Sequence, residues 1–148
     1  MKPLFSDAQA SLLRAVQRLL VAVLTYDLTG PVAVIVESAI SEDWASATFV
    51  GERHVFELRL EPAFATIDIE KNGALGRPEV SDSEALVQEH RRAVISGLMA
   101  AVANFAETIG EAEINVPGHF VADIAVVSFG PVEDNAVKLI IGALTLLN

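Results

Sequence analysis

The stretch AVISGLMAAVANFA, residues 93–106, contains no charged residue and is apolar on nearly every side of any helix drawn through it. A second uncharged stretch, LIIGALTLL, covers residues 139–147. In a chain of 148 residues, each stretch needs packing partners on more than one side. We therefore expect the protein to bury apolar surface against copies of itself or against another protein.

The composition combines high hydropathy with a strong negative charge. Hydrophobic residues make up 52% of the chain and the mean hydropathy is +0.45, yet the formal net charge is −10. Such a charge favours solubility and opposes binding to a phosphate backbone. The densest basic pair is Arg91-Arg92, so neither nucleic acid nor an anionic membrane surface is an expected partner.

Three further features predict a cytoplasmic location. The longest uncharged run is shorter than the roughly 20 apolar residues that a membrane-spanning helix needs. The first residues, MKPLFSDAQ, lack the apolar segment of a signal peptide. Cysteine is absent from the sequence, which excludes disulfides and zinc–thiolate sites and suits a reducing compartment.

The first predicted helix follows an N-terminal capping pattern formed by Ser6 and Gln9. Apolar residues recur at helical spacing over the next turns, with arginines on the other side. The sequence Thr29-Gly30-Pro31 ends this helix, because glycine suits the C-terminal cap and proline cannot continue the hydrogen-bond ladder.

A second capping pattern, Ser81 with Glu84, predicts a helix that continues to about Thr108. Its first half is polar and its second half is the uncharged run. Small residues four apart form a stripe along that run, at positions 93, 97 and 101. This stripe favours close packing of the helix on a sheet over a seam between two copies.

The strands are predicted from their residue patterns. The β-branched run at 32–40 is typical of a strand buried on both faces. A hairpin over 48–61 turns at Gly51-Glu52-Arg53 and returns as a strand at 54–61, in which apolar and charged residues alternate. Alternation at 65–69 suggests a further strand or an extended arm.

The last predicted elements are a strand at 119–129 and a returning segment at 136–147. The returning segment has features of both a helix and a strand, and its β-branched residues favour the strand. Together the elements predict a single α+β domain over 1–148, with a mainly antiparallel sheet of about five strands and two helices on one face.

No residue cluster predicts a reaction. His119 and Asp123 lie about 13 Å apart if their segment is a strand, which is too far to share a metal ion. His54 is interpreted as a turn residue and Glu89-His90 as part of a solvated helix face. The sequence holds no nucleophile motif and no phosphate loop. We therefore expect no catalytic residues, no metal and no cofactor, and the protein is predicted not to be an enzyme.

Two polar segments are candidates for contact with a partner. The loop at 71–80 is either an arm that contacts a neighbour or a solvated connection. Trp44, the single tryptophan, is interpreted as an anchor of the core rather than a platform for a ligand.

The stretch EDWASATFVGERHVFELRLE, residues 42–61, resembles the tail-terminator or tail-completion proteins of long-tailed phages and prophages. The closing GHFVADIAVVSFGPVEDNAVKLIIGALTLL, residues 118–147, is similar to the terminal hairpin of that family. The order of helix, strands, helix and terminal hairpin is also similar. The resemblance implies a ring, expected to be a hexamer, that caps the tail tube and meets the head connector, either in the host cytoplasm or in the virion.

These observations favour a non-enzymatic assembly protein that forms a homo-oligomeric ring and contacts tail-tube and head-connector proteins. The expected contact residues are the polar or aromatic side chains of the hairpin and the loop: Trp44, Glu52, Arg53, Lys71, Asn72 and Arg77. The alternative is an α+β domain that binds a small molecule in an apolar cavity between its sheet and its helices.

Overall fold

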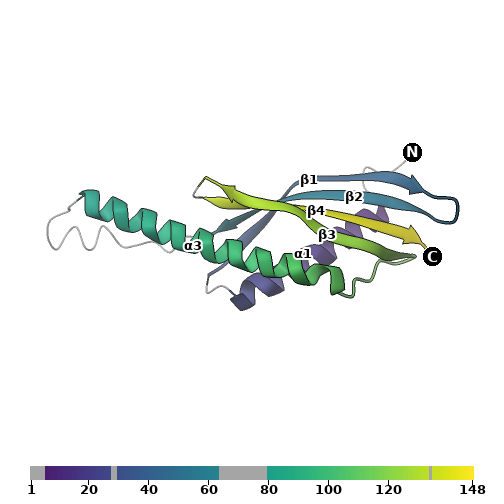
Figure 1. Cartoon of the computed structure of the whole chain (residues 1–148), viewed down its shortest axis with the longest axis horizontal. Coiled ribbons are helices and arrows are strands. Elements are labelled where there is room, and N and C mark those ends of the chain that lie inside the picture. Colours follow the sequence, from purple (N-terminus) through teal and green to yellow (C-terminus); the bar gives the residue numbers. More distant parts are fainter. Residues whose placement is uncertain (1–5, 28–29, 64–79, 134) are drawn as a thin grey trace.

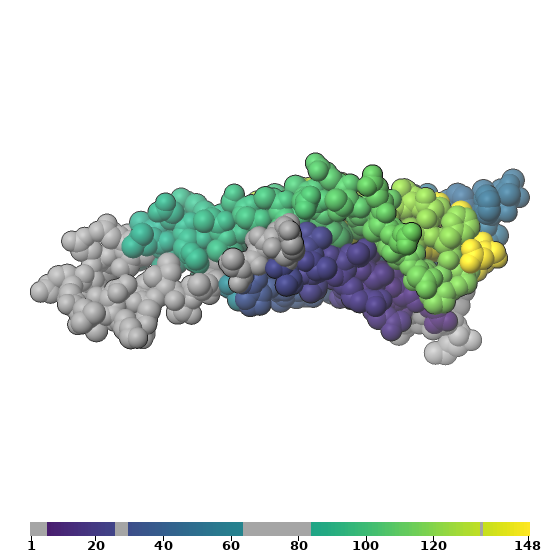
Figure 2. Space-filling view, turned by 90° about the horizontal axis from the view of Figure 1, so that it is seen from below, coloured from purple at the N-terminus to yellow at the C-terminus, as the bar shows by residue number. Residues whose placement is uncertain are grey.

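The computed structural model describes residues 6–27, 30–63, 80–133 and 135–148. Two helices lie on the same face of one antiparallel sheet (Figure 1). Seen from that face, the helices lie side by side (Figure 2). In chain order the elements are α1 (Asp7–Asp27), β1 (Val32–Ala45), β2 (Val50–Pro62), α3 (Val80–Thr108), a short 3-10 helix (Ile109–Glu111), β3 (His119–Val132) and β4 (Ala136–Leu147).

The predicted α+β class is confirmed, with a correction to the number of strands. The sheet formed by the described residues has four strands in the order β1-β2-β4-β3, where about five were predicted. The additional candidate, at 65–69, lies outside the described residues.

Helix α1 begins at the predicted cap. The backbone N–H of Gln9 donates to Ser6 Oγ at 3.0 Å, and the N–H of Ala10 donates to the Ser6 carbonyl at 3.0 Å. These bonds satisfy donors that otherwise have no partner in the first turn of a helix. Of the apolar residues predicted to face the core, Val16, Leu20 and Leu24 are buried, whereas Leu13 and Val23 are only half-buried. Ala8 and Leu12, which were not predicted, complete the buried face of the helix.

The first hairpin turns earlier than predicted. Strand β1 continues to Ala45, which pairs with Val50, and the residues predicted as the turn, 51–53, belong to β2. The turn is closed by Ser46, whose Oγ accepts hydrogen bonds from the N–H groups of Thr48 and Phe49 at 3.3 and 3.0 Å. Hydrogen bonds from the following backbone to a serine side chain therefore form this turn, in place of the glycine that we expected.

The prediction that 32–40 is buried on both faces is wrong. Strand β1 is an edge strand that pairs only with β2, and its side chains alternate between half-buried and exposed over 32–36. Only the face that meets the helices is covered. The continuous β-branched run therefore reflects strand propensity rather than two-sided burial.

The segment at 136–147 is a strand, as favoured. Strand β4 pairs with β2 on one side and with β3 on the other, so it lies inside the sheet. The register between β2 and β4 is unbroken, whereas both edge strands carry irregularities. Bulges lie between Val36 and Ser38 in β1, and between Val121 and Asp123 and between Val126 and Ser128 in β3.

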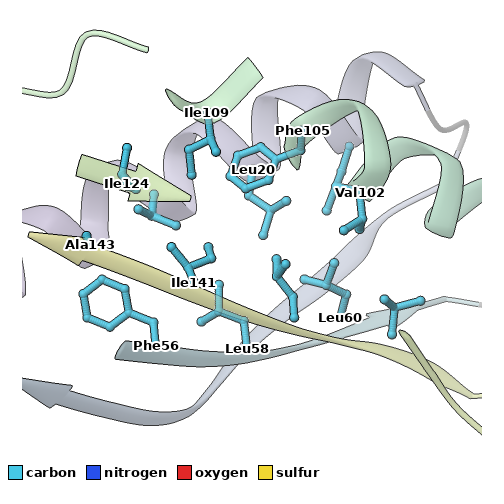
Figure 3. Close-up of a cluster of buried hydrophobic side chains, with 14 of the residues drawn as sticks. Leu20, Phe56, Leu58, Leu60, Val102, Phe105, Ile109, Ile124, Ile141 and Ala143 are labelled. Atoms are coloured by element: carbon cyan, nitrogen blue, oxygen red, sulfur yellow. The ribbon is translucent and has the colours of Figure 1, made fainter. Parts of the chain in front are cut away.

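The core lies between the sheet and the helices. Alternate residues of β2 and β4 project toward α1 and α3, and Figure 3 shows Phe56, Leu58, Leu60 and Ile141 facing Leu20, Val102 and Phe105. All of these side chains are at most 1% exposed. The apolar residues that alternate along the strands thus pack against the apolar faces of the two helices and form one continuous layer.

Helix α3 has two different halves. Its N-terminal part extends past the end of the sheet (Figure 1), while Leu98, Val102 and Phe105 in its C-terminal part are packed in the core. Among the described residues, Glu84–Glu111 is the one helical segment that is long and apolar enough to cross a membrane by length and composition alone. A core helix passes the same test, and this helix contributes to the core.

Of the small-residue stripe, Ala101 is buried in the core, Gly97 is half-buried and Ala93 is exposed. Close packing on the sheet is therefore limited to the end of the stripe nearest the core.

Leu58→Ala should lower the free energy of unfolding by about 2–5 kcal/mol, because it removes a fully buried side chain from the centre of the core. Leu86→Ala is the matched control, since Leu86 is 58% exposed on α3 and its loss should change stability by about 0.5 kcal/mol or less. Urea denaturation followed by circular dichroism measures both. Equal losses for the two variants would contradict the described packing.

Candidate functional site

A polar cluster interrupts the apolar layer at the hairpin end of the sheet. His54 on β2 is completely buried, with Ser41 Oγ of β1 at 2.6 Å from its Nδ1 and Thr145 Oγ1 of β4 at 2.7 Å from its Nε2. The strand alternation that buries Phe56 and Leu58 also turns His54 toward the helices. Three strands therefore supply the cluster, and both ring nitrogens have a partner.

The electrostatic setting keeps His54 neutral near pH 7. Burial lowers the pKa of His54 below its ordinary value of 6.5; Glu52 opposes this shift, and His119 adds to it. Glu52 Oε2 lies 3.8 Å from His54 Nε2 and accepts a hydrogen bond from Ser6 Oγ at 2.7 Å. Through Glu52, the cap of α1 is joined to the same strand that carries His54.

The contact between Ser41 and His54 has the distance of a nucleophile–base pair, but the rest of the site differs from a catalytic triad. The second ring nitrogen meets the hydroxyl of Thr145 rather than a carboxylate, and Glu52 is beyond hydrogen-bond distance from it. A neutral hydroxyl would not stabilise the imidazolium that base catalysis requires. The cluster therefore satisfies a buried histidine, which is a structural role.

No group of three or more metal-ligating side chains lies together in the part of the chain that the structure describes. His119 Nδ1 lies 3.0 Å from the Pro117 carbonyl oxygen, at the start of β3. Asp123 is exposed further along the same strand.

An acidic groove of about 620 Å³ lies beside the polar cluster, between the first turn of α1 and strands β1 and β2. Three carboxylate residues line it, namely Asp7, Asp43 and Glu52. Gln9 also lines it, is only 3% exposed, and has no partner for its Oε1 among the described residues. His119, at the start of β3, lines the groove as well, so the groove presents carboxylates, an amide oxygen and an imidazole ring.

A basic groove of about 780 Å³ runs along the solvent side of α1. Arg14 and Arg18, one turn apart on the helix, line it together with Gln17 and Asn115. In a chain with a net charge of −10, no carboxylate appears among its described lining residues. The two grooves share no lining residue.

The structure places three of the six expected contact residues near the tip of the first hairpin. Glu52 is half-buried at the acidic groove, and Arg53 is exposed on the opposite face, across from Glu42 of β1. Lys71, Asn72 and Arg77 lie outside the described residues.

Trp44 does not anchor the main core, contrary to the interpretation from the sequence. It is half-buried on β1 and lies opposite Gly51 of β2. Gly51 lies opposite Leu146 of β4, and Leu146 lies opposite Phe120 of β3, so these four residues form one row across the sheet. Strand alternation puts this row on the face away from the helices, yet Leu146 is only 6% exposed. The rings of Phe49 and Phe120 meet there in an edge-to-face arrangement, with centroids 6.2 Å apart. A second, small apolar cluster thus lies on the outer face at the hairpin end.

His54 is the residue that the sequence interpretation missed. The signal was present in the alternation of residues 54–61. Every second residue faces the same side of a strand, so His54 lies on the same side as Phe56, Leu58 and Leu60. A histidine on the apolar side of a strand indicates burial, and burial requires partners for its ring nitrogens.

Comparison with known proteins adds a likeness in fold. No protein-family model matches the sequence, and no curated protein matches it. A solved chain described as "Virion of native gene transfer agent (GTA) particle" superposes with a TM-score of 0.55 at 13% sequence identity. The superposition covers 94% of this chain and 97% of that chain. At this identity the match shows a shared fold over almost the full length of both chains.

The stability of the protein should fall as the pH is lowered through 6.5, in part because of His54. Its pKa is lower in the folded chain, so the unfolded chain binds the proton first; the stabilisation is complete above pH 6.5 and is lost below it. The free energy of unfolding in urea, measured from about pH 7.5 to about pH 5, should fall less steeply for His54→Gln. Leu86→Ala, which removes an exposed side chain on α3 and no titratable group, should keep the wild-type slope. An unchanged slope for His54→Gln would contradict a neutral buried histidine.

Proposed function

We propose that this protein is a non-enzymatic structural subunit of a phage-like particle, of the tail-terminator type, which forms a ring at the end of a tail tube. The observation that carries the proposal is the shared fold with a chain of a gene transfer agent virion over 94% of this chain and 97% of that chain. The resemblance of residues 42–61 and 118–147 to tail-terminator proteins supports the same class.

The architecture is compatible with a ring. Strands β1 and β3 are both edge strands, each paired on one side only within the described chain. A ring needs a heterologous interface, in which one patch of a subunit meets a different patch of the next. These two edges, which no further described strand pairs, are candidates for such a pair of patches.

The outer face of the sheet offers further surface for assembly. Ile40, Val55 and Val127 lie on the three strands β1, β2 and β3 and are 55%, 38% and 67% exposed. Ile40 pairs with Val55, and Val55 pairs with Gly142 of β4, so the apolar row crosses the sheet. Exposed apolar surface of this kind is typical of protein–protein contacts.

The contact residues that we propose for the ring are Trp44, Glu52 and Arg53, together with Lys71, Asn72 and Arg77 outside the described residues. Tail-tube and head-connector proteins are the proposed further partners, and the virion or the host cytoplasm is the proposed location.

The small-molecule alternative receives less support. Fully buried side chains such as Leu20, Leu58 and Phe105 fill the space between the sheet and the helices and line neither groove described above. A rise in melting temperature with apolar ligands would favour this alternative over a ring.

Light scattering on a sizing column should give a mass near six times the subunit mass of 15.8 kDa. The ring should dissociate on dilution over a roughly hundredfold concentration range, because self-association depends on concentration. Negative-stain electron microscopy would then distinguish a closed ring from a compact cluster. A strict monomer over the whole range would remove the main physical support for a ring.

Replacing residues 71–79 by a Gly/Ser segment of the same length should weaken the ring and leave the subunit folded, because we propose contact residues within this segment. The mass in solution reports the first effect, and the melting temperature and circular dichroism report the second. An unchanged mass would show that these residues do not contribute to the interface.

A further inference from the structure

The basic groove on α1 holds two arginines that no described carboxylate neutralises. Arg14 and Arg18 line the groove, and no acidic residue is among its described lining residues. Arg14 donates from Nε to the Ala10 carbonyl of its own helix at 3.4 Å, whereas Arg18 is exposed and forms no hydrogen bond or ion pair with the described residues. Like charges four residues apart on a helix repel each other. An anionic occupant would relieve this repulsion and would bind the guanidinium N–H groups that remain.

The length of the groove favours a polypeptide segment over a small anion. On α1 its lining residues run from Ser11 to Ala22. This stretch is roughly 16 Å long, and about five residues of an extended chain cover the same length. A lone phosphate or carboxylate would contact only one part of it. A nucleic-acid backbone also carries regularly spaced anions, but the net charge of −10 opposes its binding.

The spacing of the two arginines indicates where the acidic residues of such a segment lie. Arg14 and Arg18 are separated by about 6 Å along the helix axis. In an extended chain, residues i and i+2 face the same side and lie about 6.6 Å apart. Two acidic residues separated by one other residue would therefore present one carboxylate to each guanidinium. Each of these pairs can form two parallel hydrogen bonds.

The other lining residues suit the rest of the segment. Gln17 and Asn115 each carry a side-chain amide, which can donate to a peptide backbone and accept from it. Val21 and Ala22, one turn beyond Arg18, give the groove an apolar end, and Val21 is 46% exposed. An apolar side chain that covers Val21 would remove this surface from water. The groove thus combines positive charge, partners for a backbone and an apolar contact.

We propose that the basic groove binds an extended acidic segment of another protein. Two carboxylates of that segment, separated by one residue, contact Arg14 and Arg18, and an apolar side chain covers Val21. The proposal goes beyond the ring, because the groove lies on the solvent side of α1 and contains none of the described contact residues proposed for the ring. Contacts between subunits and binding of this segment can therefore be measured separately.

Binding of synthetic peptides tests the proposal. The peptide VSESESV has two glutamates separated by one residue and an apolar residue at each end, so that it fits in either direction. The peptide VSSEESV has the same composition and charge, but its adjacent glutamates face opposite sides of an extended chain. Fluorescence anisotropy of the fluorescein-labelled VSESESV should give a Kd below about 1 mM for the wild-type chain. VSSEESV should bind several-fold more weakly, and binding of VSESESV should weaken as salt rises from about 50 to about 500 mM.

Charge reversal tests whether the peptide occupies this groove. Arg14→Glu with Arg18→Glu should weaken the binding of VSESESV roughly tenfold or more, because both contacts become repulsive. Arg53→Glu with Arg92→Glu is the matched control, since it changes the net charge equally at two exposed residues outside the groove. This control should bind the peptide as the wild type does. Circular dichroism checks that each variant folds, and Arg14→Gln with Arg18→Gln replaces the reversed variant if that one does not.

Four results would overturn the proposal: no binding of VSESESV, equal binding of VSSEESV, an equal loss in the control variant, or tighter binding of an oligothymidylate than of the peptide. A lower mass in solution for Arg14→Glu with Arg18→Glu, measured by light scattering, would also overturn it, because a second copy of the chain would then occupy the groove. A wild-type chain that binds VSESESV and stays monomeric supports this proposal and removes the main support for the ring.

Discussion

The fold depends on the packing of one face of a four-stranded sheet against two helices. Side chains such as Leu58 and Ile141 project from the two central strands into a layer closed by α1 and α3. Since both helices lie on the same side, no described helix covers the other face and no described strand extends the two sheet edges. The arrangement that forms the core therefore leaves the outer face without a helical layer.

The buried histidine marks the point where this apolar layer ends. His54 occupies a position that belongs by alternation to the core, and hydroxyl groups from two neighbouring strands satisfy its ring. The adjacent Glu52 bonds Ser6 at the cap of α1, so the start of the helix is joined to the sheet at the same place. Polar side chains that join α1 to the sheet thus lie directly beside the acidic groove.

Much of the fold was predictable because it rests on periodicity. The cap at Ser6, the helix to Thr108 and the preference for a strand at 136–147 all follow from local residue patterns, and the structure has each of them. The position of the first turn did not follow, because Ser46 closes it through its side chain while the glycine of the region continues the strand.

The candidate site was less accessible to sequence reasoning. It joins residues from α1, β1 and β2 that are far apart in the sequence. Trp44 was interpreted as a core anchor because the sequence does not show that its position opposite Gly51 lies on the face away from the helices.

The bulges in the two edge strands limit which other strands can pair with this sheet. Bulges occur in β1 and β3, and none interrupts the pairing of the two central strands. A bulge bends a strand and leaves one residue out of the ladder, so a flat strand from an unrelated chain cannot continue its hydrogen bonds. Sheet edges that are unpaired, as both are within the described chain, can pair with strands of other molecules. A bulged edge pairs best with a strand that has a matching bulge. This selectivity opposes open-ended polymerisation through the sheet edges and still allows pairing in a closed complex.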